Sequence, residues 1–343
     1  MTDARLSVIV ASRHRPEALV RCVKALRQQI GVLIEVIVVA DPESCQRLQG
    51  DDLKIVVYDE ANISVARNLG LAEAAAPFVA FIDDDAVAEP TWAVRLYQGL
   101  NQKGLVAATG FVLGRNGLSY QWRAAYVDGK GVDHPFEAGD QDVVPRPSLG
   151  LAVKLQGTNC ALSTVALGQA GGFDPAYRFY LDDADLSLRI SRLGQSAIVP
   201  GAQVHHGFLA SERRRADRVP LSLHDIGAST AVFLRRHCPE SLAEGYERFA
   251  GEQKARLSRH LSEGRLTRVT YRALMASLDA GWDQGLGREL SVLEPLCHNP
   301  ASFLPVASTA NGGGAVLGGF SAINSFVKPR VAHQRATSFR FSV

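Results

Sequence analysis

The stretch "FVAFIDDDAVAEP" (residues 78–90) runs from an apolar segment directly into three consecutive aspartates, Asp83, Asp84 and Asp85. Adjacent carboxylates repel one another, so an uncompensated cluster at the end of a buried strand would cost stability. Side chains alternate along an extended backbone, which places Asp83 and Asp85 on the same side. Such a D-x-D pair suits a hard divalent cation, Mg2+ or Mn2+, bound together with substrate phosphates. The pair alone is a weak motif, and a solvated loop or a helix cap explains it equally well.

The segments before this stretch alternate between strand-like and helix-like patterns. Continuous apolar runs at residues 6–11, 34–41 and 53–59 are typical of strands buried on both faces of a parallel sheet. Residues 15–29 and 63–75 have helical spacing. This order predicts an α/β fold with a mostly parallel, Rossmann-like sheet flanked by helices. Ligands of such sheets bind beyond the carboxyl ends of the strands, where the aspartate cluster and Asp41 are expected to lie.

Composition limits the class of protein and its partners. The 343 residues are 46% apolar and 21% charged with a net charge of +2, which is typical of a globular protein and gives no sign of a nucleic-acid partner. The five cysteines are scattered and odd in number, and neither a signal peptide nor a membrane span is evident. We therefore expect a cytoplasmic protein.

The chain divides into three parts by pattern. Residues 1–219 carry the motifs and are expected to form the catalytic domain, residues 220–300 are helical by periodicity, and residues 301–343 form a Gly-rich, then basic and aromatic tail. The C-terminal part is a candidate for an acceptor platform or for a peripheral contact with the inner face of an anionic membrane. Packing on the catalytic domain or oligomerisation explains it equally well. The tail residues in question are Phe326, Lys328, Arg330, Arg335 and Arg340.

Three later segments of the sequence concentrate acidic or basic residues. Asp182, Asp183 and Asp185 begin a predicted helix, where the helix dipole favours acids, and a carboxylate beside a cation site can act as a general base. His205 and His206 end a predicted strand, so only one of them is expected to face the site. The run "SERRRADR" (residues 211–218) is either a solvated face or a set of arginines that bind a diphosphate.

Taken in order, these stretches resemble the family 2 glycosyltransferases, inverting enzymes with the GT-A fold. "LSVIVASRHRPEALVRCVKALRQQ" (residues 6–29) is similar to the opening strand and helix of that family, and "NISVARNLGL" (62–71) to its N-x-G-x-x-x-A-R-N-x-G. "FVAFIDDDAVAEPTW" (78–92) is similar to its D-x-D strand. "GTNCALSTVALGQAGGFDPAYRFYLDDADLSLRI" (157–190) resembles its acceptor-side segment, in which G-G-F-D precedes E-D-x-D-L-x-x-R.

The resemblance implies a sugar transfer from a nucleotide-diphosphate sugar to a saccharide or lipid-linked saccharide acceptor, in bacterial cell-surface polysaccharide or lipopolysaccharide synthesis. It implies that Asp183 is the general base. The metal, Mn2+ or Mg2+, would be bound by Asp83, Asp85 and His205. The nucleotide-sugar side would comprise Ala11, Ser12, Arg13, Asp41, Arg67, Asp83, Asp84, Arg213 and Arg215. The acceptor side would comprise Gly157, Asn159 and Asp182.

The chain departs from the family pattern at several points. The usual D-D-G-S is "ADPES" (residues 40–44), the usual E-D is Asp182-Asp183, and Ser64 replaces the first glycine of N-x-G-x-x-x-A-R-N-x-G. A nucleotidyltransferase is the enzymatic alternative, although "ASRHRPE" (11–17) lacks a Gly-rich phosphate loop. A transferase that binds nucleotide or sugar without turnover is the alternative from another class.

Overall fold

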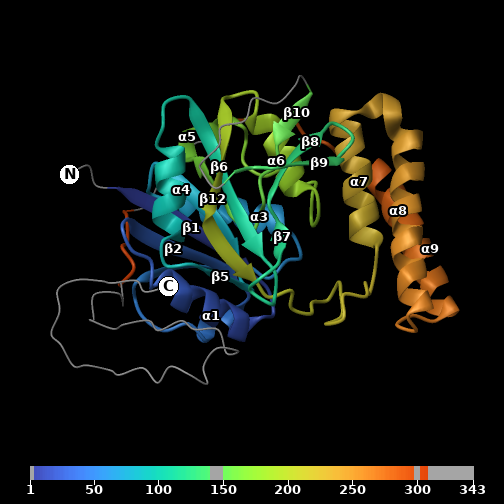
Figure 1. The fold of residues 1–343 in the computed structure, drawn as a ribbon, viewed down its shortest axis with the longest axis horizontal. Coiled ribbons are helices and arrows are strands. Elements are labelled where there is room, and N and C mark those ends of the chain that lie inside the picture. The colour runs from blue at the N-terminus through green and yellow to red at the C-terminus, as the bar shows by residue number, and fades with distance from the viewer. Residues whose placement is uncertain (1–3, 140–149, 297–301, 308–343) are drawn as a thin grey trace.

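A nine-stranded sheet forms the centre of the computed structural model (Figure 1), which describes residues 4–139, 150–296 and 302–307. Its strand order is β3-β2-β1-β4-β11-β6-β12-β5, and β7 pairs with β6. Strands β1 to β4 are mutually parallel, β11 runs antiparallel between β4 and β6, and β12 is parallel to β6. The predicted mostly parallel α/β sheet is confirmed. The strands are β1 (Arg5–Ser12), β2 (Leu33–Ala40), β3 (Leu53–Val57), β4 (Phe78–Asp83), β5 (Ala86–Ala88), β6 (Leu105–Leu113), β7 (Tyr120–Trp122), β11 (Cys160–Ser163) and β12 (Gln195–His206).

Helices cover both faces of the sheet, which explains why the strands are apolar throughout. Val8 and Val10 of β1 point into a core that also contains side chains of α1 and α4, whereas Ile9 points into a second core with side chains of α3, α5 and α6. Alternating side chains of one strand therefore supply two separate cores. The helices are α1 (Pro16–Leu26), α2 (Pro42–Gln46), α3 (Ile63–Glu73), α4 (Trp92–Leu100), α5 (Thr164–Gln169) and α6 (Asp182–Ile190).

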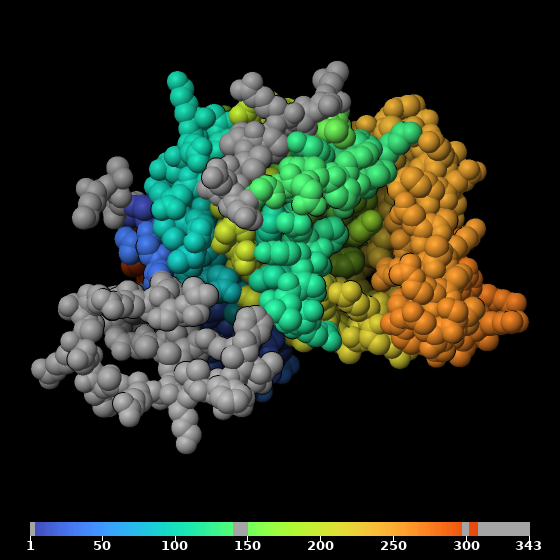
Figure 2. Space-filling model, viewed as in Figure 1, coloured from blue at the N-terminus to red at the C-terminus, as the bar shows by residue number. Residues whose placement is uncertain are grey.

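Two smaller units complete the described chain. A three-stranded sheet has the order β10 (Leu151–Val153), β8 (Ala124–Asp128) and β9 (Asp133–Phe136). A helical region follows β12, with α7 (His224–His237), a 3-10 turn (Pro239–Ser241), α8 (Leu242–Ser262) and α9 (Arg268–Leu286). Figure 2 shows the surface hollowed between this orange helical region and the green strands β7 and β8.

The predicted helical C-terminal region is present, and it is anchored to the sheet domain. Phe233 of α7 packs with Tyr177 and Leu181 in one buried cluster, and α8 and α9 share another cluster with Leu223. The segment 302–307 lies back on the sheet, because the amide of Val306 donates to the carbonyl of Ile34 at 2.9 Å. The basic and aromatic tail residues predicted from sequence lie outside the described residues. None of the described helices is long and apolar enough to cross a membrane.

Candidate active site

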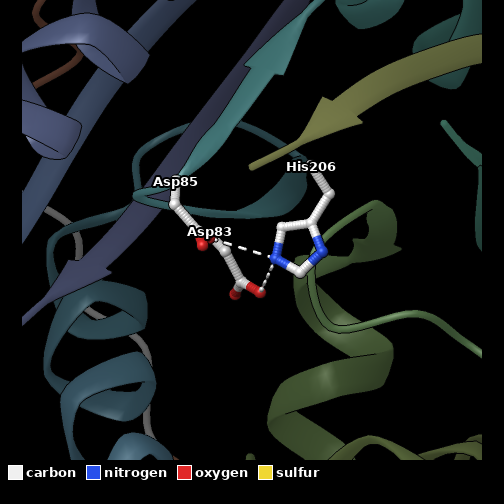
Figure 3. Close-up of side chains that lie close together, drawn as sticks. All are labelled: Asp83, Asp85 and His206. Carbon is white, nitrogen blue, oxygen red and sulfur yellow. Dashed lines mark ion pairs between the residues drawn. The ribbon is translucent and has the colours of Figure 1, made fainter. Parts of the chain in front are cut away.

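Three side chains that can bind a metal converge at the carboxyl end of the sheet. Asp83 ends β4, Asp85 lies in the turn to β5, and His206 ends β12. The antiparallel pairing of β12 with β5 places His206 opposite Ala86, next to Asp85. His206 Nε2 is 3.0 Å from Asp85 Oδ1 and 3.8 Å from Asp83 Oδ2 (Figure 3). One ligand atom from each of the three residues lies within 4.8 Å of the other two, so this group can hold a divalent metal ion.

The neighbouring histidine lies outside this group, which corrects the predicted metal ligand. His205 Nε2 is 2.5 Å from Glu89 Oε1, on the other side of the strand. Adjacent side chains of an extended strand point in opposite directions, so when one histidine faces Asp83 and Asp85 the other cannot. The histidine of the candidate metal group is therefore His206 and not His205.

The three adjacent aspartates have different environments. Burial raises the pKa of Asp84 to about 7, and the attraction of Arg15 and the hydrogen bond from Ser12 only partly offset this. Burial also opposes ionisation of Asp85, but the hydrogen bond and charge of His206, together with the charge of Arg15, hold its pKa well below the usual range. Asp83 is half-buried and lines the cleft that is described below. The repulsion expected from the sequence is thus relieved by cations around Asp85 and by the raised pKa of Asp84.

Asp84 faces away from the cleft, contrary to the prediction that it contacts the nucleotide sugar. Its carboxylate accepts from Ser12 Oγ at 2.6 Å and lies 2.6 Å from Arg15 Nη2, and the residue is fully buried. Arg15 also lies 3.5 Å from Asp85, so its guanidinium bridges the two aspartates of the turn. Asp84 therefore ties the aspartate turn to the end of β1.

We expect the stability of the protein to fall as the pH rises from about 4 to about 7, by up to about 4 kcal/mol. A pKa raised on folding means that the folded state holds the proton more tightly, so this stability is present at low pH and is lost through the folded pKa. The pH dependence of Asp85 lies at lower pH, because its pKa is lowered. Urea unfolding with a chelator present measures the slope. In Asp84→Asn the slope should be clearly shallower, and an unchanged slope would exclude Asp84 as its source.

A cleft of about 640 Å³ lies beside the metal-binding group. Its walls come from the end of β1, the start of α3, the end of β4, residues 156–158, the turn before α6 and the segment after β12. Most of the predicted site residues lie together here. The predicted residues that line the cleft are Ala11, Ser12, Arg13, Arg67, Asp83, Asp85, Gly157, Asp182, Asp183 and Arg213.

Three further predicted residues do not line this cleft, and each has a structural role. Asp41 caps α2 and accepts from the amide of His14 at 2.7 Å, so it supports the loop after β1. Asn159 is fully buried and hydrogen-bonds to Trp92 and to two backbone carbonyls. Arg215 pairs with Asp217 at 2.8 Å. The motif pattern placed all three near the site but could not show which way their side chains point.

The acids at the start of α6 also differ from one another. Asp182 is buried and paired with Arg67, and Asp185 is buried between Arg189 at 2.6 Å and His237 at 2.8 Å. Asp183 is half-buried, accepts from the amide of Gly157 at 3.2 Å and has no cation within ion-pair distance among the described residues. Of these three carboxylates, Asp183 is the one available to a ligand in the cleft.

The turn that carries these acids is held by the helical region. Tyr180 and Leu181 both have positive φ, 75° and 64°, a conformation that costs free energy for residues other than glycine. Ser229 of α7 donates to the carbonyl of Phe179 at 2.6 Å, and Leu181 packs against α7. This contribution of α7 could not be predicted from the sequence, because the periodicity of a helix does not indicate its partner.

The arginine run after β12 contributes a cation that the sequence analysis did not single out. Arg213 lines the cleft, but its Nε is 2.8 Å from Asp225. Arg214 also lines the cleft and packs on Phe208, and it has no carboxylate within ion-pair distance in the described chain. Burial lowers the pKa of Arg214, although the charge of Asp85 opposes this. A cation in this position is available to an anionic ligand.

The mostly parallel sheet, the helical layers and the helical C-terminal region agree with the GT-A fold that the sequence predicts. Residues 7–151, a little over two fifths of the chain, match the family described as Glycosyl transferase family 2. The resemblance seen in the sequence is confirmed. No curated protein sequence matches the chain.

Solved structures that match the chain are distant from it in sequence. GalNAc-T7 with UDP, GalNAc and Mn2+ is 12% identical with a TM-score of 0.51, over 68% of this chain and 48% of that one. The chain thus spans about half the length of that protein. S. aureus TarS 1-349 is 16% identical with a TM-score of 0.49, over 82% of this chain and 79% of TarS. The mannosyltransferase PcManGT from Pyrobaculum calidifontis, in complex with GDP-Man and Mn2+, is 16% identical with a TM-score of 0.45, over 82% and 87%.

Proposed function

We propose that the protein transfers a sugar from a nucleotide-diphosphate sugar to an acceptor hydroxyl, with inversion and with a divalent metal ion. The observation that carries this proposal is the placement of Asp183 and Arg214 on the walls of the cleft that contains Asp83, Asp85 and His206. The cleft thus offers a carboxylate that has no cation partner among the described residues, together with cationic groups. This arrangement suits a reaction in which a hydroxyl loses a proton and a diphosphate leaves.

Asp83, Asp85 and His206 would hold the metal ion, which when bound neutralises negative charge on the diphosphate. A mixed set of carboxylate and imidazole ligands suits Mn2+ better than Mg2+, which prefers oxygen alone. GalNAc-T7, which has a similar fold, was solved with UDP and Mn2+. UDP and Mn2+ are therefore the first ligands to test.

Asp183 would accept the proton of the acceptor hydroxyl as that oxygen attacks the anomeric carbon. The amide of Gly157 orients the Asp183 carboxylate. Arg214 would bind the departing diphosphate, because guanidinium groups bind phosphate oxygens strongly at a site with little water. An attack opposite the leaving group inverts the anomeric centre and requires no covalent intermediate on the enzyme.

For the acceptor, we propose a class of compounds. A saccharide or a lipid-linked saccharide, as used in the assembly of cell-surface polysaccharides, fits a cleft lined by both polar and aromatic groups, with Trp122, Phe179 and Tyr180 among them. The alternatives raised by the sequence, a nucleotidyltransferase and a binding module without turnover, have no specific support in the site.

Calorimetry with UDP, GDP and dTDP, each with and without Mn2+, tests the proposal. We expect one nucleotide to bind in a Mn2+-dependent manner and His206→Ala to weaken this binding by about 10- to 100-fold, because the variant removes a metal ligand. His205→Ala is the matched control: it removes the adjacent imidazole, which contacts Glu89, and should bind as the unmodified protein does. Binding that ignores both Mn2+ and His206 would refute the proposed metal role.

A further inference from the structure

The turn between α8 and α9 carries a concentration of positive charge that the proposed function does not use. Residues 254–272 contain six basic residues and one acid, in a chain whose total net charge is only +2. This stretch alone has a net charge of +5, so the rest of the chain has a net charge of −3. The turn is at the lower end of the orange helices in Figure 1. The six basic residues are Lys254, Arg256, Arg259, Arg265, Arg268 and Arg272.

Most of these charges are not compensated within the protein. Lys254, Arg259, Arg268 and Arg272 are exposed and have no carboxylate within ion-pair distance in the described chain. Arg256 donates to a carbonyl, that of Arg218, at 3.4 Å, and within this stretch only Arg265 has an acidic partner, Glu263. The crowding affects a neighbour: burial lowers the pKa of His260, and the charges of Arg265 and Arg256 lower it further.

Helix stability does not explain the placement of these residues. Arg268 and Arg272 lie in the first turns of α9, which has no acid in its first turn. Cations at a helix N-terminus are disfavoured by the helix dipole. Val269, between them, is 78% exposed, and valine is a weak helix former. Two arginines and an exposed valine at this position therefore suit a contact outside the chain.

The basic turn is continuous with the rim of the cleft. Arg215 Nη1 donates to the carbonyl of Arg265 at 3.3 Å, which joins the segment after β12 to the turn. In the same segment, the guanidinium of Arg218 lies 3.9 Å from the ring centre of Phe208, whose ring is 4.5 Å from that of His206. A surface bound at the turn would thus lie near the entrance of the cleft.

We propose that the α8–α9 turn, defined as residues 254–272, docks the protein on a membrane that carries anionic lipids. Anionic headgroups complement exposed arginines, and the interfacial region also accommodates an exposed valine, which a water-soluble polyanion would not stabilise. Docking here brings the cleft to the surface where a lipid-linked acceptor resides. The proposal goes beyond the transfer reaction and concerns where the reaction takes place.

Sedimentation of the full chain with vesicles tests this surface. We expect binding to vesicles of phosphatidylcholine and phosphatidylglycerol in equal parts, none to phosphatidylcholine alone, and weakening by salt. The variant Arg259→Gln/Arg268→Gln/Arg272→Gln should bind about 100-fold more weakly, at roughly the contribution of three surface arginines. The matched control is Arg21→Gln/Lys24→Gln/Arg192→Gln, which removes the same charge from exposed positions elsewhere and should bind as the unmodified protein does.

Several outcomes would overturn the proposal. Equal vesicle binding by the turn variant and the unmodified protein would assign the contact to another part of the chain, such as the basic tail. Equally weakened vesicle binding by both triple variants would show that the binding depends on net charge and not on the turn. Retention on immobilised polyphosphate without vesicle binding would replace the membrane by a soluble polyanion. Nucleotide binding by the turn variant, measured by calorimetry, shows whether it is folded and is independent of the vesicle result.

Discussion

Asp183→Asn is expected to lower the turnover number by about 100- to 10,000-fold while leaving nucleotide affinity unchanged. The amide cannot accept the proton of the acceptor hydroxyl, although it matches the carboxylate in size. Nucleotide binding should persist, because Asp183 is separate from the group formed by Asp83, Asp85 and His206. The measurement is release of nucleoside diphosphate from the corresponding sugar donor, with a panel of saccharide acceptors. The donor is chosen from the calorimetric result.

Asp51→Asn is the control for this experiment, because Asp51 is an exposed acid outside the cleft and its loss should leave turnover unchanged. A split between turnover and affinity distinguishes loss of a base from loss of the fold. If Asp183→Asn turns over at the normal rate, another group must accept the proton. If it loses nucleotide binding as well, Asp183 contributes to donor binding, and its assignment to proton transfer alone is wrong.

The sequence predicted the sheet because its signal is local. Continuous apolar strands, such as residues 6–11, alternate with helices whose apolar residues have helical spacing, and this alternation permits few topologies. In the structure β1 and β4 are parallel neighbours, and Asp83 and Asp85 lie at the carboxyl end of β4, where ligands of such sheets bind.

The direction and the partner of each side chain were harder to predict. The choice between His205 and His206 depends on the register between β12 and β5, which no local pattern specifies. The arginine run poses the same difficulty, since Arg213 is paired with Asp225 whereas Arg214 has no carboxylate partner in the described structure. The contact between Ser229 and Phe179 joins residues 50 positions apart, beyond the reach of periodicity.

Arg67 also illustrates this limit. Its family position suggests a residue that faces the nucleotide, yet its guanidinium is committed to the protein. It pairs with Asp182, donates to the carbonyl of Gly157 at 3.2 Å and lies 5.0 Å from the ring centre of Phe173. Both members of the pair are buried. Arg67 thus joins α3 to the turn that presents Asp183, and its removal leaves a carboxylate buried without a cation partner.

Arg67→Met should therefore lower the free energy of unfolding by about 1 to 2 kcal/mol near pH 7, because the unpaired carboxyl can take up a proton at a cost set by its folded pKa of about 6. Methionine fills much of the same volume, so the loss reports charge more than packing. Urea unfolding followed by tryptophan fluorescence measures it. The double variant Arg67→Met/Asp182→Leu should recover most of the stability, because it also removes the unpaired carboxylate.

The pH dependence of the Arg67→Met loss tests its physical cause. Burial already raises the pKa of Asp182 to about 6, against the attraction of Arg67 and with the repulsion of Asp183. Without Arg67 that pKa rises further, so protonation at about pH 5 removes the unpaired charge and the stability loss should shrink. A loss of equal size at both pH values, or one that Asp182→Leu fails to relieve, would assign the role of Arg67 to packing against Phe173 instead of to charge.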